Sequence, residues 1–264
     1  MELLRYFALF RQLMRTSAQV AMQYRLDFLL GGAMAFFWVG WTVAPLLLVF
    51  HHRTDIGGWT LPEALLVIAF FMILKAMLEG AVSPNLVAVV EHIRKGTLDF
   101  ILVKPVDAQF MVSASRFAFH KLVDASAGIA LAVWSAHRLG LDVGIVQIGG
   151  AFAMLCAAVA ILYSLWLIVI SLAFWFVRVD NLSYLFTAIF DAARWPVSVF
   201  RGWVRFVLTF VIPVGLMTTF PAMALLGTLT PGRLLAGVAL AVAFLAGSRV
   251  VWNRAVSRYA SASS

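Results

Sequence analysis

The chain has 264 residues, of which 63% are hydrophobic and only 12% are charged. An average soluble domain is about 45–50% apolar and about 25% charged, so this composition excludes an ordinary soluble globular domain. The net charge is +8, but the basic residues flank apolar stretches instead of forming a nucleic-acid-binding face. The single cysteine, Cys156, leaves no intrachain disulfide and no cysteine-based metal cluster. We therefore expect a membrane protein with no nucleic-acid partner.

The apolar runs match the length of membrane-spanning helices, which need about 20 residues. Ahead of them, arginines from Arg5 to Arg25 alternate with apolar residues, which predicts an amphipathic helix on the inner membrane surface and no cleaved signal peptide. The clear runs are Leu29 to Phe50, Leu61 to Ala81, Phe117 to Ala136, Ile145 to Val177 and Leu234 to Trp252. The run from Ile145 is so long that it must tilt, bend at Gly149-Gly150 or project beyond the bilayer.

The segment from 182 to 227 is ambiguous, because charged residues and helix breakers interrupt it. The breaks are Asp191, Arg194 and Pro196 in the first half, and Pro213, Gly215 and Pro221 in the second. Lys and Arg favour the cytosolic side, and six spans with both termini cytosolic place thirteen basic residues inside and six outside. We therefore predict an all-α protein with six spans, in which Leu182 to Phe200 is the fifth and segment 204–228 re-enters the outer leaflet. Alternatively, 182–200 lies on the inner surface and 206–227 spans.

Several ionisable residues fall inside the predicted spans. Lys75 and Glu79 lie one helical turn apart in the second run, so both side chains share one face. Asp191 with Arg194, and Asp124 with Lys121, repeat this spacing near other helix ends. Ionisable groups at such depth are costly unless they are paired or hydrated. The pattern is consistent with internal ion pairs and also with an intramembrane functional site or a proton relay.

Sequence motifs for catalysis are absent. The sequence contains no G-x-x-x-x-G-K-[ST] phosphate loop, no H-E-x-x-H and no G-x-S-x-G. His51 and His52 with Asp55 are better explained as an interfacial boundary than as a metal site. We therefore expect a chain that is not itself an enzyme and that binds no metal or cofactor.

The longest polar connection, Glu91 to Met111, has the pattern of a helix break followed by a short helix. Gly96 ends the preceding helix, Thr97 is a predicted cap for a new one, and Lys104-Pro105 stops it. Such a short helix, with apolar residues at Leu98 and Phe100, has the shape of a segment that docks into a groove of a partner. An interfacial connector is the alternative.

This loop also resembles a known family. Residues 93–100 (Ile-Arg-Lys-Gly-Thr-Leu-Asp-Phe), followed by Leu102, Lys104-Pro105-Val106-Asp107 and Gln109-Phe110, closely resemble the cytosolic loop of permease subunits in the type-2 class of ATP-binding-cassette (ABC) transporters. Further segments resemble the same family and extend the similarity over nearly the whole chain: Tyr24 to Leu30, Gly58 to Glu63, Pro84 to Leu86, Phe174 to Arg178, Val211 to Val214 and Phe220 to Ala222.

The resemblance implies a single permease domain over residues 1–264. An interfacial helix would occupy 1–27, the first two spans 28–90, a cytosolic coupling loop 91–111, and the remaining four spans 112–264, with a re-entrant hairpin before the last. Two permeases would pair with two separate ATPase subunits, which bind ATP and Mg. Export is the usual direction in this class, in a bacterial inner membrane, and a heteromer of two related permeases is slightly favoured over a homodimer.

By the same analogy, the coupling contact with the ATPase would comprise Arg94, Lys95, Gly96, Thr97, Leu98, Asp99, Phe100, Lys104 and Pro105. Thr97 to Phe100 would sit in an ATPase groove, and Arg94 and Lys95 would orient the docking. Two other functions are compatible with the sequence: a membrane scaffold or sensor partnered with an ATPase, and an ion-coupled secondary transporter that uses Lys75 and Glu79. The resemblance marks no substrate residue, and the sequence does not distinguish drug, lipid, peptide or glycan.

Overall fold

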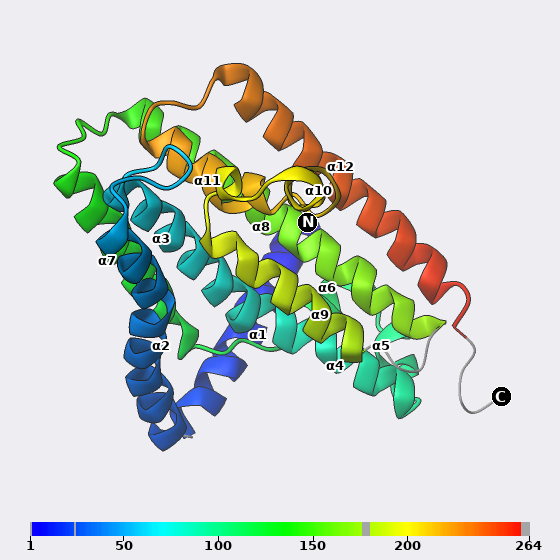
Figure 1. Ribbon diagram of the computed structural model, residues 1–264. Coiled ribbons are helices and arrows are strands. Elements are labelled where there is room, and N and C mark those ends of the chain that lie inside the picture. Colours follow the sequence, from blue (N-terminus) through cyan, green and yellow to red (C-terminus); the bar gives the residue numbers. More distant parts are fainter. Residues whose placement is uncertain (1, 24, 176–179, 260–264) are drawn as a thin grey trace.

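The structure is a computed structural model that describes residues 2–23, 25–175 and 180–259, and in these ranges it is helical without strands (Figure 1). The α-helices are α1 (Glu2–Gln23), α2 (Arg25–His52), α3 (Leu61–Met77), α4 (Ser83–Arg94), α5 (Asp99–Leu102), α6 (Ala108–Ser113), α7 (Lys121–Arg138), α8 (Ile145–Ser171), α9 (Asp180–Asp191), α10 (Gly202–Phe206), α11 (Val214–Leu225) and α12 (Pro231–Val256). Shorter elements are the π-helical turns η1 (Leu78–Val82) and η5 (Val207–Val211), and the 3-10 turns η2 (Leu172–Phe174), η3 (Ala192–Arg194) and η4 (Val197–Val199).

Within the described ranges, four helical stretches are long and apolar enough to cross a bilayer: Leu30–His52, Leu61–Arg94, Ile145–Phe174 and Pro231–Val256. A fifth crossing results if Gly202–Thr209 and Val214–Leu225, which meet at 77°, count as one bent span. These stretches agree with a polytopic all-α membrane protein. The described residues give four or five candidate spans where the sequence predicted six.

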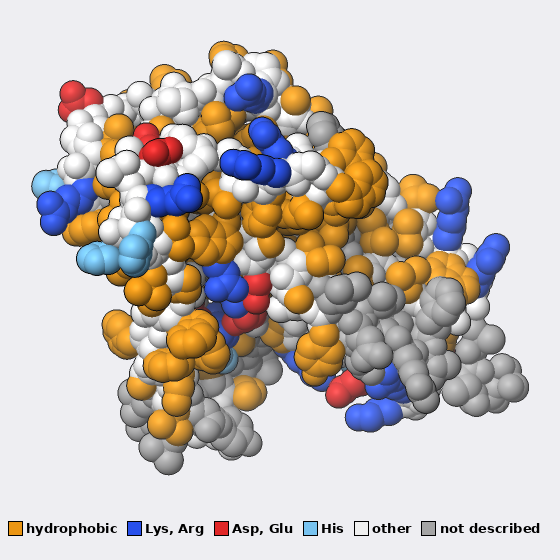
Figure 2. Space-filling model, in the orientation of Figure 1, with side chains coloured by type: hydrophobic (Ala, Val, Ile, Leu, Met, Phe, Trp, Pro, Cys, Tyr) orange, Lys and Arg blue, Asp and Glu red, His pale blue; other side chains and the backbone are white. Residues whose placement is uncertain are grey.

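The core forms where α3 and α8 pack with α7, α11 and α12. Leu66, Leu74, Ile161 and Met217 are fully buried members of this core. The helices α2 and α12 lie at opposite margins of the bundle (Figure 1), and only 11% of the apolar window of Leu30–His52 and 17% of that of Pro231–Val256 are buried. Orange hydrophobic surface accordingly covers much of the molecule in Figure 2, as expected of a protein surrounded by lipid.

One continuous rod of 34 residues, Leu61–Arg94, runs through the centre of the molecule. It begins at a capping box, where the Thr60 backbone N–H donates to Glu63 Oε2 at 2.8 Å. The rod passes through the π-helical turn η1 without stopping, so the helix predicted to end at Ala81 continues into α4. Beside the turn, the Gly80 carbonyl accepts a hydrogen bond from the Ala118 backbone N–H at 2.8 Å, which fixes the entry to α7.

The segment 182–200 differs from the prediction of a single spanning helix. Helix α9 ends at Asp191, and the short turns η3 and η4 follow it. The 12 residues of α9 rise about 18 Å, less than the roughly 30 Å of a hydrocarbon core. The physical reason is Pro196, which disfavours a helical conformation at the residue before it, and Trp195 is indeed extended with ψ at 142°.

Three other predicted elements differ in detail. Helix α8 continues through Gly149-Gly150 without a break. The predicted third run from Phe117 becomes helical only at Lys121. The bent pair breaks at Ile212, directly before Pro213, whereas Pro221 lies inside the continuous helix α11.

Close packing of α7 on α3 depends on Gly128. An added Cβ at this position would lie 2.9 Å from the Ala69 carbonyl oxygen and 2.9 Å from Ile73 Cγ1, and helices in membranes use small residues for such close approach. Gly149 in α8 is a matched control, because an added Cβ there meets nothing within 4 Å.

We therefore expect Gly128→Ala to destabilise the protein by about 1–3 kcal/mol, because a well-packed interface must open. Gly149→Ala should leave stability unchanged or raise it, since Ala favours helix. Thermal unfolding of the detergent-purified protein measures both, and equal midpoints for the two variants would contradict the packing role of Gly128.

Candidate functional site

The loop after α4 begins with a tight helix end. Gly96 adopts a left-handed conformation with φ at +65°. Its N–H donates to the Ile93 carbonyl at 3.2 Å, and the Thr97 N–H donates to the His92 carbonyl at 2.9 Å. This pair of hydrogen bonds is a Schellman motif, for which glycine is the favoured residue. The motif separates α4 from the short helix α5.

The short helix α5 presents an apolar surface that differs from the predicted one. Leu98 is fully buried inside the chain, whereas Phe100 is 72% exposed and Val103 is 78% exposed. Thr97 does not cap α5, because its Oγ1 lies 2.8 Å from His92 Nδ1. Leu98 therefore anchors the segment, and Phe100 and Val103 point outward. Val103 was not among the predicted site residues, although its i+3 spacing from Phe100 is a helical-face signal.

The charged and proline residues predicted for this loop surround that apolar surface. Arg94, Lys95, Lys104 and Pro105 are exposed, and Asp99 begins α5. The loop thus combines two protruding apolar side chains with several basic ones, which is a composition suited to a protein interface.

Helices from three other parts of the chain hold the second half of the loop. Asp107 caps α6 by accepting from the Phe110 N–H at 2.9 Å. From α12, Arg249 donates to both carboxylate oxygens of Asp107, at 3.1 and 2.5 Å, and to Gln109 Oε1 at 2.7 Å. The Tyr163 hydroxyl of α8 accepts from Gln109 Nε2 at 3.0 Å. We call Asp107, Gln109, Tyr163 and Arg249 the loop clamp.

The helix α1 adds to this arrangement. Arg5 donates to the Pro105 carbonyl at 2.9 Å, and the Tyr6 hydroxyl accepts from the Asp107 N–H at 3.1 Å. The Tyr6 ring also packs edge-on against Phe110, with centroids 4.9 Å apart. The sequence did not indicate the role of Arg249, because a contact across 142 positions has no local signal.

A second candidate site is a chain of alternating charges in the middle of the molecule. Lys75 Nζ lies 3.0 Å from Asp191 Oδ1 and 4.0 Å from Glu79 Oε1. Lys121 Nζ lies 2.5 Å from Glu79 Oε2 and 3.2 Å from Asp124 Oδ2. At the far end, Arg194 Nε donates to the Asp191 carbonyl at 2.9 Å. We call these six side chains the charge network: Arg194, Asp191, Lys75, Glu79, Lys121 and Asp124.

The charge network joins residues that the sequence had placed in separate pairs. Its members come from α3, η1, α7, α9 and η3. Their side chains are between 21% and 35% exposed. Figure 2 shows basic and acidic side chains gathered in a hollow beside α2. With three cations and three carboxylates, the network is electrically balanced.

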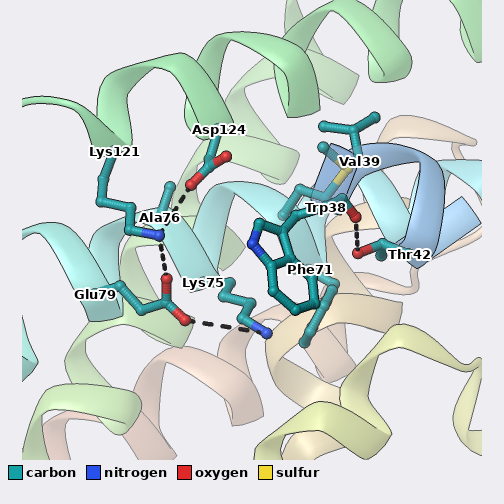
Figure 3. A pocket seen from close by; sticks show the side chains of 10 residues that line it. Trp38, Val39, Thr42, Phe71, Lys75, Ala76, Glu79, Lys121 and Asp124 are labelled. Atoms are coloured by element: carbon teal, nitrogen blue, oxygen red, sulfur yellow. Dashed lines mark hydrogen bonds and ion pairs between the residues drawn. The ribbon is translucent and has the colours of Figure 1, made fainter. Parts of the chain in front are cut away.

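A cavity of about 350 Å³ opens beside this network. Figure 3 shows Lys75, Glu79, Lys121 and Asp124 on one side of it, and Trp38 and Phe71 from α2 and α3 on another. The cavity therefore has a charged floor and an aromatic wall.

The residues predicted for the re-entrant hairpin lie at the start of α11 and within it, and they belong neither to the loop clamp nor to the charge network. Pro213 precedes α11, and Gly215 in α11 packs closely against Val197. A Cβ added at Gly215 would lie 2.8 Å from Val197 Cβ.

His51 and His52 pack edge-on against each other at the end of α2. In the described ranges no group of three or more His, Cys, Asp or Glu side chains is arranged to hold a metal ion.

An all-helical bundle with several apolar spans defines a multi-pass membrane protein. The family model described as "ABC-2 family transporter protein" matches residues 36–263, so the chain belongs to the ABC-2 transporter family. No curated protein and no solved structure matches the chain. Membership makes the chain a permease subunit of an ABC transporter, partnered with ABC ATPase subunits in a membrane, and it confirms the resemblance found in the sequence.

The loop clamp predicts a pH dependence. The hydrogen bonds from Arg249 hold the pKa of Asp107 below its ordinary value of 3.8, against the opposing effect of burial. A carboxylate whose pKa is lowered by folding stabilises the folded state at pH values above its ordinary pKa. This stabilisation is lost as the pH falls through the lowered pKa.

We expect Asp107→Asn to lower stability by about 1 kcal/mol at neutral pH, because solvent screens part of the interaction. The difference from the unsubstituted protein should shrink below pH 3.8, which thermal unfolding at a series of pH values would show. Asp142→Asn, at an exposed position, is the control. A difference that stays constant down to the most acidic folded sample would contradict the assigned role of Asp107.

Proposed function

We propose that this permease subunit belongs to an ATP-driven exporter and is coupled to its ATPases through residues 94–105. The observation that carries the proposal is the outward display of Phe100 and Val103, 72% and 78% exposed, on a helix whose other side is anchored by buried Leu98. Exposed aromatic and aliphatic side chains with basic neighbours are the usual anchors of a protein interface. An ATPase groove would bind these two side chains, and Arg94 and Lys95 would orient the docking.

Two connections would transmit ATPase movement into the membrane. The first is the rod Leu61–Arg94, which joins the loop directly to Lys75 and Glu79 of the charge network. The second is the loop clamp, through which Asp107 and Gln109 are tied to Arg249 of α12. Movement of α5 would therefore act on the central rod and on the last helix together.

The remaining assignments belong to the same proposal. The ATPase subunits would bind ATP and Mg, since the sequence holds no phosphate loop, and this chain would perform no catalysis. Both termini would face the cytosol of a bacterial cell, with the protein in the inner membrane, and a second permease, a related chain rather than a copy, would complete the path. The bent pair at Pro213 supports a re-entrant hairpin in the outer leaflet.

Phe100→Asp tests the coupling assignment. Placing a charge at a central apolar anchor should weaken association with the ATPase by at least about 10-fold, since such anchors contribute about 2 kcal/mol or more. The measurement is the amount of ATPase that co-purifies with the tagged permease in mild detergent.

Ile145→Asp is the matched control, because Ile145 is 90% exposed at the start of α8 and lies outside the loop. It should retain the ATPase. Full ATPase recovery with Phe100→Asp would reject the coupling assignment. ATP-dependent flux of a fluorescent amphiphile into reconstituted vesicles separates a transporter from a scaffold or sensor, which would bind the ATPase but sustain no flux.

A further inference from the structure

The cavity beside the charge network has the dimensions of a small-molecule site. Its volume is about 350 Å³, within the roughly 300–1,000 Å³ typical of such sites. Two ammonium groups and two carboxylates line it, from Lys75, Lys121, Glu79 and Asp124 (Figure 3). These four charges sum to zero.

Charge balance decides which ligand the cavity favours. A ligand with a net charge would compete for one partner and leave another charge of the network uncompensated, among side chains that are only 21% to 35% exposed. A ligand with one positive and one negative group can pair with both kinds of side chain and leave the total balanced. The network therefore favours a zwitterion over a simple anion or cation.

The lining side chains have hydrogen-bonding capacity left for such a ligand. A lysine ammonium has three donors, and an ionised carboxylate has about four acceptor positions. Among the described residues, Lys75 Nζ has one hydrogen bond, to Asp191 at 3.0 Å. Glu79 Oε1 lies 4.0 Å from Lys75 Nζ, which is too far for a hydrogen bond. The positive and negative groups of a ligand could bind at this gap without breaking the network.

The other wall of the cavity is apolar. Trp38 and Val39 of α2 and Phe71 and Met72 of α3 line it. Aromatic side chains offer large apolar contact area, and their ring faces also attract cationic groups. A ligand with an apolar portion attached to its charged end would satisfy both walls.

We propose that this cavity binds a small amphipathic zwitterion, whose opposite charges pair with Lys75, Lys121 and Glu79 and whose apolar portion lies against Trp38 and Phe71. The proposal rests on the transport function proposed above, because it names the class of substrate that the permease recognises. A zwitterionic membrane lipid and a soluble amphipathic zwitterion share this chemistry.

Three probes with the same six-carbon tail test the charge preference: hexylphosphocholine, hexyl phosphate and hexyltrimethylammonium. Each is titrated calorimetrically into the complex purified in a nonionic detergent. We expect hexylphosphocholine to bind at least about 10-fold more tightly than either singly charged probe. Tryptophan fluorescence is recorded for the same probes. Trp38→Phe should remove most of the change in tryptophan fluorescence on binding, which locates the probe in this cavity.

Substitutions of the network should redirect the preference. Glu79→Gln leaves an excess positive charge and should favour hexyl phosphate, whereas Lys121→Met should favour hexyltrimethylammonium. The double variant Glu79→Gln with Lys121→Met removes one charge of each sign, keeps the balance and should retain the zwitterion preference, which guards against misfolding of the single variants. Arg138→Gln is the control, because Arg138 stacks on Trp134 at the far end of α7, away from the cavity.

A competition experiment distinguishes the two sources of ligand. In nanodiscs, phosphatidylethanolamine in place of phosphatidylglycerol should weaken hexylphosphocholine binding if a lipid occupies the cavity, and should leave it unchanged if the ligand is soluble.

The proposal would be overturned if all three probes bound equally, or if the network variants altered the affinity for every probe by the same factor. If those results came from a complex that retains its ATPase and ATP-dependent flux, the transport function would stand. Loss of the ATPase from every preparation would instead reject the transport function, and the probe titrations would remain interpretable.

Discussion

Charges inside an apolar bundle must be paired, and this constraint organises the centre of the protein. Lys75 lies on the central rod, and its ion pair with Asp191 positions the end of α9 beside α3. Glu79 lies on the π-helical turn, where its contact with Lys121, together with the Gly80 carbonyl bond, positions the start of α7. Segments far apart in the chain are thus brought together by electrostatic pairing as well as by apolar packing.

The same rod connects the two candidate sites. Helix α4 is the continuation of α3 through η1, so one continuous helix carries Lys75 and Glu79 of the charge network and leads into the loop with Phe100. The loop clamp gives the loop a second attachment, from Asp107 to Arg249. A loop held at two places can transmit displacement, whereas a loop held at one end would absorb it by bending. Leu98 contributes to this rigidity from inside the chain, which explains why an apolar residue of the loop is buried.

Sequence reasoning succeeded where the signal is local. The long apolar runs predicted α2, α8 and α12, and Gly96 predicted the end of α4, because run length and glycine conformation depend on neighbouring residues only. It failed over 182–200, where hydropathy suggested a span and Pro196 ended the helix first. It paired Lys75 with Glu79 by helical spacing, but their closest charged partners, Asp191 and Lys121, come from other helices. Leu98 and Phe100 were predicted together as docking residues, yet Leu98 is buried and Phe100 is exposed. A four-residue helix has too few turns for its periodicity to define an inner face.

The sequence by itself determined that this chain is a polytopic helical membrane protein and an ABC-2 permease. Composition, run length and the loop motif carry that information, and none of them depends on how the helices pack. Only the tertiary structure decided that six charges form one balanced network beside a cavity, and that Arg249 holds Asp107. The physical reason is that these contacts join residues more than 100 positions apart in several cases. Which side chains meet across helices depends on the relative rotation and depth of each helix, and close packing at small residues such as Gly128 sets both.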